Sequence, residues 1–243
     1  DPEVPLVVPE VNPQAILKHK GIIANPNCST IIMVMALKPI YDLAKIKRVI
    51  VSTYQAVSGA GKEGIDELDA QVREHSEGRE MTANILPSAS AEKHYPIAFN
   101  LIPQIDVFCD NLYTKEEMKM VNETKKIMED YEMRITATTI RVPVYRSHSE
   151  SVNIELEKEV DLGAMREALA KFPGVTVQDD PSKQEYPMPL YTSEKDDVYV
   201  GRLRRDESCE KSYNMWVVGD QIRKGAALNT LQIAETMIKN GWI

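Results

Sequence analysis

The chain has 243 residues, of which 43% are hydrophobic and 27% charged, and its formal net charge is −8. This composition is typical of a globular protein with one or at most two domains, and the acidic balance argues against a nucleic-acid surface. No apolar run reaches the roughly 18 residues of a membrane span, the first residues do not resemble a signal peptide, and three scattered cysteines predict neither a disulfide framework nor a metal site. These features favour a cytoplasmic protein.

The first part of the chain leads to a cysteine at a predicted helix start. Four prolines among the first 13 residues indicate extended connecting chain, and a helix is expected from Pro13 with Gly21 beyond its end. The apolar residues 21–24 predict a short buried strand, which a turn joins to a long buried helix. Cys28 lies where that helix would begin, Asn27 or Ser29 would cap it, and Pro39 would end or kink it.

A cysteine in this position has a specific chemistry. The unpaired N–H groups and the positive dipole end at a helix N-terminus both favour the thiolate over the thiol. Cys28 is therefore predicted to be a nucleophile and to react faster than Cys109 and Cys209. The alternative is a small buried residue in a tight turn, because free cysteine is among the most buried residue types.

A glycine-rich segment follows the next predicted strand, residues 46–56. Gly59-Ala60-Gly61-Lys62-Glu63-Gly64 matches the dinucleotide pattern G-x-G-x-x-G and opens a helix expected at residues 65–77. The second strand and its acidic end, which that motif requires about 20 residues further on, are not found. We therefore discount a pyrophosphate site here, and a tight turn is the alternative use of the glycines.

The remaining pattern predicts the fold class. Thr114 and Glu117 have the spacing of a capping box for a helix that extends to Tyr131. The other expected elements are strands at residues 134–144 and 151–157, a helix at 161–171 with Asp161 as its cap, a polar loop at 179–196, strands at 198–203 and 213–218, and a closing helix at 226–240. Consecutive strands with interspersed helices predict an α+β domain on a mixed, largely antiparallel sheet.

Three segments carry a family resemblance: residues 25–30 (NPNCST), 54–61 (YQAVSGAG) and 141–152 (RVPVYRSHSESV). Together they resemble aspartate-β-semialdehyde dehydrogenase, along essentially the whole chain. Glyceraldehyde-3-phosphate dehydrogenase and N-acetyl-glutamyl-phosphate reductase also carry a cysteine at a strand-to-helix turn, but the pair Arg141 and His148 looks closer to the semialdehyde enzyme. The resemblance implies a fold like the C-terminal domain of glyceraldehyde-3-phosphate dehydrogenase, with helices packed on one face of the sheet.

The resemblance also implies a division of the chain. Residues 1–27 would be the remnant of a nucleotide-binding domain and its connection, 28–225 the catalytic and dimerisation domain, and 226–243 a helix that returns to the nucleotide-binding domain. In the family, a Rossmann half with a phosphate-binding arginine lies ahead of this point. The chain therefore looks like the C-terminal part of a longer enzyme.

Site residues follow from the same resemblance. Cys28 is implied to be the nucleophile, His148 the general acid and base, and Gln55 the residue that orients the substrate. Glu116 would contact the substrate's amino group, Lys119 its phosphate and Arg141 its carboxylate. The residues implied to bind NADP are Ser58, Gly59 and Asn229. Without the resemblance, each of these residues also has an ordinary structural interpretation. His148 could be a surface histidine and Gln55 an amide that caps a turn. Arg141 could lie on a solvent-exposed strand face, and Glu116 and Lys119 could form an exposed i,i+3 ion pair.

In the biosynthetic direction, the family converts L-aspartyl 4-phosphate to aspartate 4-semialdehyde and phosphate with NADPH, through a cysteine thioester. This reaction belongs to the biosynthesis of lysine, threonine, methionine and diaminopimelate. The implied partners are these small molecules and further copies of the chain, in a homodimer or homotetramer, without nucleic acid or membrane. Two alternatives remain: a related acyl-phosphate reductase, and a catalytically inactive oligomerisation fragment.

Overall fold

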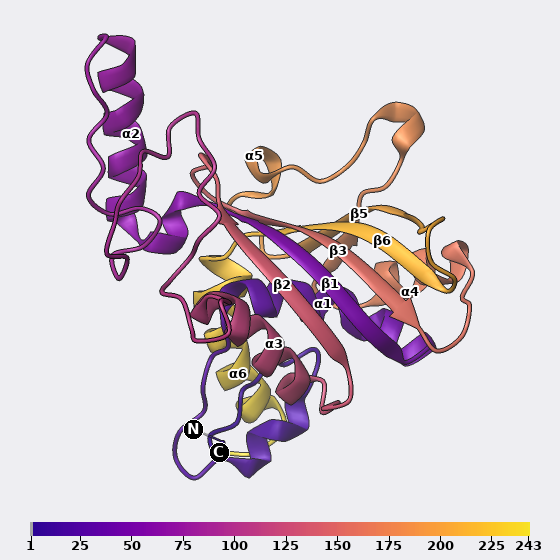
Figure 1. Ribbon diagram of the computed structural model, residues 1–243. Coiled ribbons are helices and arrows are strands. Elements are labelled where there is room, and N and C mark those ends of the chain that lie inside the picture. Colours follow the sequence, from indigo (N-terminus) through magenta and orange to yellow (C-terminus); the bar gives the residue numbers. More distant parts are fainter. Residues whose placement is uncertain (1) are drawn as a thin grey trace.

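The computed structural model describes residues 2–243 and shows a twisted sheet with helices beneath it (Figure 1). Helices that lie far apart in the sequence pack together on this sheet. The helices are α1 (Cys28–Leu43), α2 (Lys62–Ser76), α3 (Lys115–Ile127), α4 (Leu162–Lys171), α5 (Pro189–Thr192) and α6 (Leu228–Lys239). The strands are β1 (Ile46–Gln55), β2 (Arg134–Arg141), β3 (His148–Leu156), β4 (Val175–Val177), β5 (Val198–Arg205) and β6 (Ser212–Gly219).

Within the described residues, six strands form one sheet in the order β2-β1-β3-β6-β5-β4. The pairs β1/β3, β3/β6 and β5/β6 are antiparallel, whereas β1/β2 and β4/β5 are parallel. The predicted mixed, largely antiparallel sheet is confirmed. β1 and β2 are parallel, and β3 is antiparallel to β1. The last residues of β1 and β2 and the first residue of β3 therefore lie along one edge of the sheet, which is formed by these strand ends.

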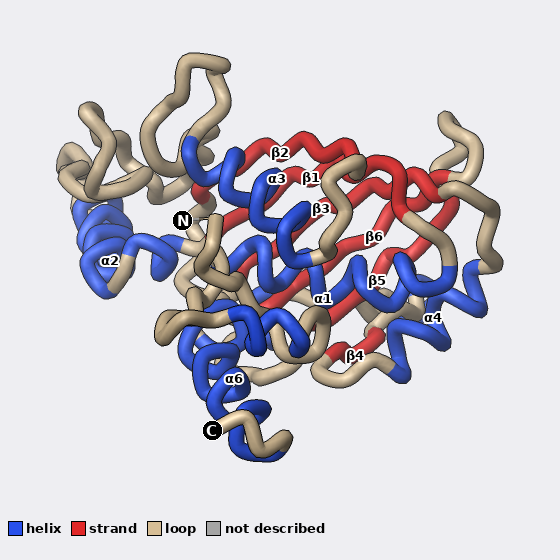
Figure 2. Tube along the Cα trace, turned by 90° about the horizontal axis from the view of Figure 1, so that it is seen from below, coloured by secondary structure: helices blue, strands red, loops and turns tan. Residues whose placement is uncertain are grey.

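The helices cover one face of this sheet, as expected. Figure 2, seen from below, shows α1, α3 and α4 in front of the strands. Along β1, Val49 and Val51 face these helices and are buried, while Arg48 and Ile50 point to the opposite face and are only half-buried. Strand alternation of this kind gives one face to the core and leaves the other available for a different contact.

Helix α1 is the centre of the core. Its residues 29–37 are all fully buried, so the helix is apolar on every side and packs between the sheet and the outer helices. Asn27 caps it, since its Oδ1 accepts a hydrogen bond from the Thr30 N–H at 3.0 Å. The helix continues through Pro39 to Leu43, so the expectation that Pro39 ends it is wrong. Burial of the flanking residues compensates for the one hydrogen bond that a proline removes.

In the N-terminal part, the predicted strand is absent and the predicted helix is present but of a different type. Residues 21–24 form no strand: Ala24 makes an isolated bridge with Leu6, and Ile22 is 66% exposed. Gly21 has φ +101°, so the chain turns at this residue. The residues after the turn pair with the preceding segment only at the Leu6–Ala24 bridge. The helix expected from Pro13 is a short 3₁₀ helix, Pro13–Lys18.

Elsewhere the boundaries differ by a few residues. β2 ends at Arg141 instead of residue 144, β3 begins at His148 instead of residue 151, and α2 begins at Lys62 instead of residue 65. The short β4 and α5 were not expected, because three or four residues carry too little periodicity to be recognised. A π turn, Arg223–Ala227, precedes α6. Among the residues that the model describes, no helix is long and apolar enough to cross a membrane.

One buried group in the core stands out electrostatically. Glu150 lies on β3, two residues after His148, and is fully buried. Neither of its carboxyl oxygens has a hydrogen-bond partner among the described residues. This burial raises the pKa of Glu150 well above its usual range, so the folded protein favours the neutral form of the carboxyl group.

This carboxyl group should make stability depend on pH. Its folded pKa lies above its unfolded pKa, so between the two values the folded chain holds a proton that the unfolded chain releases. The free energy of unfolding should therefore fall as the pH rises above the unfolded value, by up to about 1.4 kcal/mol per pH unit. Glu150→Gln should remove this slope and be more stable than the unmodified chain at pH 8. Urea unfolding between pH 5 and 8 measures it.

Glu155→Gln is the matched control for this measurement. Glu155 lies on the same strand, but hydrogen bonding to Lys47 lowers its pKa below the ordinary 4.5, so its contribution falls below the measured range and Glu155→Gln should leave the slope between pH 5 and 8 unchanged. Parallel stability profiles for the unmodified chain and Glu150→Gln would contradict the expectation.

Candidate active site

The predicted site residues meet at one edge of the sheet. Gln55 ends β1 and is paired in register with Arg141, the last residue of β2. His148 begins β3 at the same edge, where Tyr54 and Ser149 are paired. Cys28 is the first residue of α1, whose N-terminus points to this edge from below the sheet. Strand ends and a helix start thus bring together residues from four separate parts of the chain.

Cys28 is half-buried, and the π turn before α6 packs directly against it. A Cβ built on Gly225 would lie 2.9 Å from the Cβ of Cys28, so no larger residue fits there. Burial raises the pKa of the Cys28 thiol to about 12, the Glu116 carboxylate adds to the shift, and Arg141 opposes it. The predicted helix start is therefore right, but the predicted lowering of the thiol pKa is wrong. Burial and the carboxylate outweigh the helix N-terminus in this state.

This reversal changes the expected labelling pattern. At pH 7, iodoacetamide should modify the exposed Cys209 and the partly exposed Cys109 before Cys28, because only a small fraction of Cys28 is thiolate. With a pKa of about 12, the Cys28 rate should rise about tenfold per pH unit as far as the fold persists. Peptide mapping by mass spectrometry measures all three rates. Preferential labelling of Cys28 at pH 7 would show that the helix N-terminus dominates instead.

His148 is fully buried and held in one orientation. Its Nδ1 accepts a hydrogen bond from the Ala56 N–H at 3.0 Å. Burial, and secondarily the positive charge of Arg141, lower the pKa of His148 well below 6.5, so the imidazole is neutral at neutral pH. Because Nδ1 is the acceptor, the hydrogen bond assigns the proton to Nε2. Nε2 has no hydrogen-bond partner among the described residues, so this N–H is available to a ligand.

Arg141 is 2% exposed and anchored by the backbone. Its Nε donates to the Pro87 carbonyl at 3.1 Å and its Nη1 to the Ala56 carbonyl at 2.8 Å. Burial lowers the pKa of Arg141 to about 10, which still leaves it positively charged at neutral pH. A Cβ built on Gly59 would lie 2.7 Å from Nη1 of Arg141 and 3.1 Å from Cε1 of His148, so the Gly59 backbone closes over both side chains.

Glu116 on α3 connects most of the remaining residues. Its Oε1 accepts hydrogen bonds from Asn27 Nδ2 at 2.8 Å and Gln55 Nε2 at 3.2 Å. Lys119, one turn further along α3, lies 3.5 Å from its Oε2. The interpretation of this pair as an exposed surface ion pair is not supported, because Glu116 is only 6% exposed.

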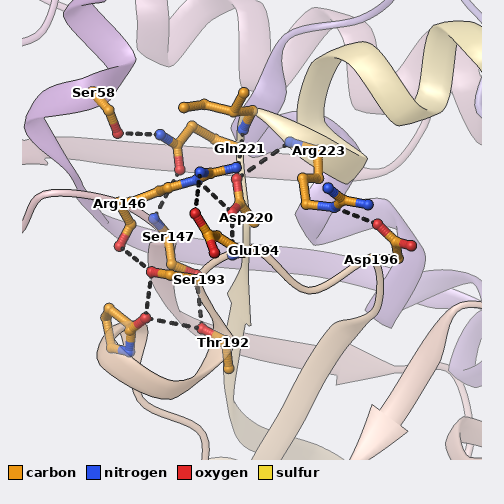
Figure 3. Close-up of polar contacts among 12 residues, drawn as sticks. Ser58, Arg146, Ser147, Thr192, Ser193, Glu194, Asp196, Asp220, Gln221 and Arg223 are labelled. Atoms are coloured by element: carbon orange, nitrogen blue, oxygen red, sulfur yellow. Dashed lines mark hydrogen bonds and ion pairs between the residues drawn. The ribbon is translucent and has the colours of Figure 1, made fainter. Parts of the chain in front are cut away.

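Some residues in contact with the site were not predicted. Glu123 accepts a hydrogen bond from the Asn27 N–H at 2.7 Å, and burial raises its pKa. Gln221 is buried and bridges two segments: its Nε2 donates to Ser58 Oγ, and its Oε1 accepts from the Ser147 N–H at 2.9 Å (Figure 3). The polar residues directly after the predicted strand at 213–218 were the available sequence signal for Gln221.

The structure separates the three expected NADP-binding residues. Ser58 and Gly59 lie beside His148, in the 3₁₀ turn that follows β1. Asn229 is fully buried on α6, where its Nδ2 donates to the Val7 carbonyl at 2.9 Å and to Asn25 Oδ1 at 2.8 Å. These contacts favour a structural role for Asn229, which joins the C-terminal helix to the N-terminal segment.

The glycine-rich segment does not have the setting of a dinucleotide motif. Gly61 and Gly64 belong to the start of α2, and this helix projects away from the sheet instead of packing on it (Figure 1). The next strand along the chain is β2, which begins only at Arg134 and ends on a positive residue. In the part of the chain that the model describes, no group of three or more metal-ligating side chains is found.

Comparison with known proteins gives consistent matches. The family model "Semialdehyde dehydrogenase, dimerisation domain" matches residues 37–224. Aspartate-semialdehyde dehydrogenase of Aquifex aeolicus is 56% identical over 245 residues, covering 100% of this chain and 70% of that protein. The Bacillus subtilis enzyme of the same name is 52% identical over 240 residues, covering 98% of this chain and 69% of that protein.

Solved structures agree with these matches. Aspartate semialdehyde dehydrogenase II from Vibrio cholerae, complexed with ASA, superposes with a TM-score of 0.92 at 46% identity, covering 98% of this chain and 69% of that chain. The Candida albicans enzyme, solved with NADP, superposes with a TM-score of 0.72 at 26% identity, covering 99% of this chain and 68% of that chain. Sequence identity, coverage and fold together show that this chain belongs to the aspartate-semialdehyde dehydrogenase family.

Proposed function

We propose that this chain supplies the catalytic and dimerisation part of an NADP-dependent aspartate-semialdehyde dehydrogenase. The observation that carries the proposal is the convergence of a thiol, a neutral imidazole with a free Nε2–H and a buried guanidinium at one sheet edge. Acyl transfer needs these three parts: a nucleophile, a proton donor and an anchor for the substrate's negative charge.

The substrate contacts follow from the charges. Arg141 uses Nε and Nη1 for backbone carbonyls, which leaves Nη2 to bind the α-carboxylate of aspartyl 4-phosphate. Glu116 would bind the α-amino group, and Lys119, whose side chain is 46% exposed, would bind the phosphate. Gln55, already bonded to Glu116, would orient the substrate between them. Glu116 and Lys119 would give up their contact with each other when the substrate binds, whereas Arg141 would keep both backbone carbonyls.

The proposed acyl transfer begins with sulfur. The proton of the Cys28 thiol passes to a phosphate oxygen of the substrate, and the sulfur attacks the acyl carbon. The carbonyl oxygen becomes negative, and the Nε2–H of His148 donates a hydrogen bond to it. Collapse of this intermediate breaks the carbon–oxygen bond to phosphate and leaves a thioester on Cys28. After reduction of the thioester carbonyl, the Nε2–H of His148 acts as general acid towards the resulting oxygen, and His148 regains this proton when the aldehyde carbonyl forms. The carbon–sulfur bond breaks in that step, and the sulfur takes a proton from water to return the thiol.

The residues beside His148 fit the nicotinamide end of a cofactor. Gly59 leaves no room for a Cβ against Arg141 and His148, so its backbone lies directly over these two side chains, and Ser58 lies next to it. When bound there, NADPH supplies the hydride for reduction of the thioester. The described residues show no comparable fit for the pyrophosphate, since α2 follows β1 but projects away from the sheet instead of packing on it.

The termini of the chain support the division inferred from the family. The segment before α1 packs with α6 in a small apolar cluster of its own, formed by Val7, Ala15, Ile16 and Ile233. Leu17 and Ile238 nearby are 57% and 67% exposed. We infer that residues 2–27 and 226–243 connect to a nucleotide-binding domain, which would cover these apolar side chains.

The open face of the sheet is the proposed dimer interface. It carries Ile50, Tyr54 and Trp216, and the rings of the last two lie 5.5 Å apart. A groove of about 300 Å³ continues this apolar surface, lined by Trp216, Tyr186 and Met188 and bordered by two arginines. A sheet face of this size and composition is suited to a second copy of the chain.

Self-association is the corresponding expected result. The chain should sediment as a dimer or tetramer at micromolar concentration, and Ile50→Glu should shift it to monomer, because a charge would be buried in an interface of upwards of about 2,000 Å². Leu231→Glu is the control, since Leu231 is 56% exposed on α6, away from the open sheet face. Sedimentation velocity measures both. A monomer without any substitution would contradict the proposal.

A chimera tests the enzyme function and its substrate. The portion of the Aquifex aeolicus enzyme that this chain does not match is joined to this chain, which covers 70% of that protein. The chimera should oxidise aspartate semialdehyde with NADP and phosphate, measured as NADPH formation. Glutamate semialdehyde is the comparison substrate: faster oxidation of it would favour the related acyl-phosphate reductase. No oxidation of either, from a folded chimera, would favour the inactive oligomerisation fragment.

A further inference from the structure

The residue before His148 adopts an unusual backbone conformation. Ser147 has φ +76°, in the left-handed region, although it is not glycine, and it is fully buried. Such a conformation persists only where the surroundings determine it. The strain lies one residue from the proposed proton donor, so whatever holds Ser147 also sets the direction of the His148 ring.

Side chains hold this turn from three directions (Figure 3). The strands β3 and β6 pair as far as His148 and Gly219. Beyond these residues a side chain takes the place of the backbone pairing: Gln221 Oε1 accepts a hydrogen bond from the Ser147 N–H at 2.9 Å. From the segment around α5, Thr192 Oγ1 lies 2.7 Å from Ser147 Oγ, and Ser193 Oγ donates to the Arg146 carbonyl at 3.2 Å.

Asp220 lies at the centre of these contacts and is fully buried. Its Oδ2 lies 2.7 Å from Nε of Arg146, in an ion pair without hydrogen-bond alignment, and accepts the Glu194 N–H at 2.6 Å. Its Oδ1 accepts the N–H groups of Ile222 at 2.9 Å and Arg223 at 3.2 Å. One carboxylate thus joins the turn before His148, the α5 segment and the start of the π turn.

The π turn extends this connection to the nucleophile. Gly225 lies in that turn, and its N–H donates to the Asp220 carbonyl at 3.3 Å. The backbone of Gly225 packs against Cys28, as the 2.9 Å from its built Cβ to the Cys28 Cβ shows. The two carboxylate oxygens of Asp220 therefore contact both segments that position the proposed reacting groups. Oδ2 contacts the turn before His148, and Oδ1 contacts the start of the π turn that packs against Cys28.

We propose that Asp220 is a positioning residue that fixes His148 and Cys28 relative to each other. The catalytic meaning of this inference rests on the proposed function, but the geometric claim does not. Loss of the Oδ2 contacts should release Ser147 from its strained conformation, turn the His148 ring and loosen the Ala56–Nδ1 hydrogen bond. The imidazole would then no longer be confined to the Nε2–H form.

The test compares two buried aspartates with the same kind of partners. Asp220→Asn keeps an oxygen for Ile222 and Arg223 but presents an amide to Arg146. Asp179→Asn is the matched control: Asp179 pairs with Arg166 at 2.9 Å, accepts the Arg202 N–H at 2.7 Å, and its side chain is 1% exposed. That pair joins α4 to β5, which β6 separates from the strand of His148.

The readout is the ¹⁵N spectrum of histidine-labelled chain, with the His148 signals assigned from His148→Gln. We expect the unmodified chain and Asp179→Asn to give the same signals, one nitrogen protonated and one not. Asp220→Asn should shift both His148 nitrogens towards exchange-averaged values and change the Cys28 alkylation rate at pH 9 at least fivefold. The melting temperatures of the two variants show whether they lose similar stability.

Unchanged His148 signals in a folded Asp220→Asn, or an equal shift in Asp179→Asn, would overturn the proposal. If Asp220→Asn does not fold, Arg146→Lys decides, because it keeps the positive charge and removes the planar contact to Oδ2. It should move the same signals in the same direction, and unchanged signals would again overturn the proposal. No readout requires turnover, so a failure of the proposed acyl transfer would be seen separately in the chimera.

Discussion

Titration of the 243-residue chain alone with NADPH is expected to give no saturable change in the fluorescence of the nucleotide. Ser58 and Gly59 can contact one end of the cofactor, but the described residues contain no strand–helix–strand cradle for its pyrophosphate. Positioning of reactants contributes roughly 7–11 kcal/mol to a barrier reduction, so its loss should abolish reduction of a thioester. Acylation of Cys28, which needs no nucleotide, can still be detected by mass.

The chimera with the Aquifex aeolicus segment is the positive control for this titration, and it should bind NADPH saturably. Tight binding by the unmodified 243 residues would show that the glycines at 59–64 form a complete dinucleotide site. In that case our account of these glycines, as a turn next to His148, would be wrong.

In the chimera, Cys28→Ser should lower kcat/KM for aspartate semialdehyde by on the order of 10⁴-fold or more. The structure gives a specific reason for so large a loss. A serine hydroxyl needs a neighbouring base, but His148 presents an N–H at Nε2 and uses the lone pair of Nδ1 for Ala56. Initial rates of NADPH formation measure the effect.

The substrate anchors remain in this variant, because the side-chain contacts of Arg141 and Glu116 do not involve the sulfur. KM should therefore change much less than kcat. Cys209→Ser is the control, since Cys209 is exposed in the turn between β5 and β6. A Cys28→Ser chimera with more than a tenth of the unmodified rate would exclude Cys28 as the nucleophile.

The sequence predicted those features that depend on local patterns. The strand predicted at residues 46–56, the capping box at Thr114 and the cap at Asn27 all appear as expected, because each is determined by residues a few positions apart. Residues 21–24 were misread for the opposite reason. An apolar run becomes a strand only where a partner strand exists, and here Leu6 provides a single bridge.

Local sequence patterns could not predict the electrostatics of the site. The thiol pKa of Cys28 depends on burial and on Glu116, which reaches the helix start from a different helix. Asp220 and Gln221 reach the turn before His148 through tertiary contacts with residues around 146 and 194. Sequence motifs could thus name the candidate residues, but only the three-dimensional arrangement shows which charges surround them.

The two apolar clusters near the site have a consequence for hydrogen exchange. Cys28 starts a helix that is embedded in the main core, so the amides of α1 should exchange only when the whole domain unfolds. Pro87, whose carbonyl holds Arg141, is next to Leu86 of the smaller cluster, which also contains Val57, Leu68 and Ile97. That cluster can open at lower cost, and each opening would release the guanidinium from the Pro87 carbonyl while the nucleophile stays in place. The proposed substrate anchor would then fluctuate on a timescale that the reacting sulfur does not share.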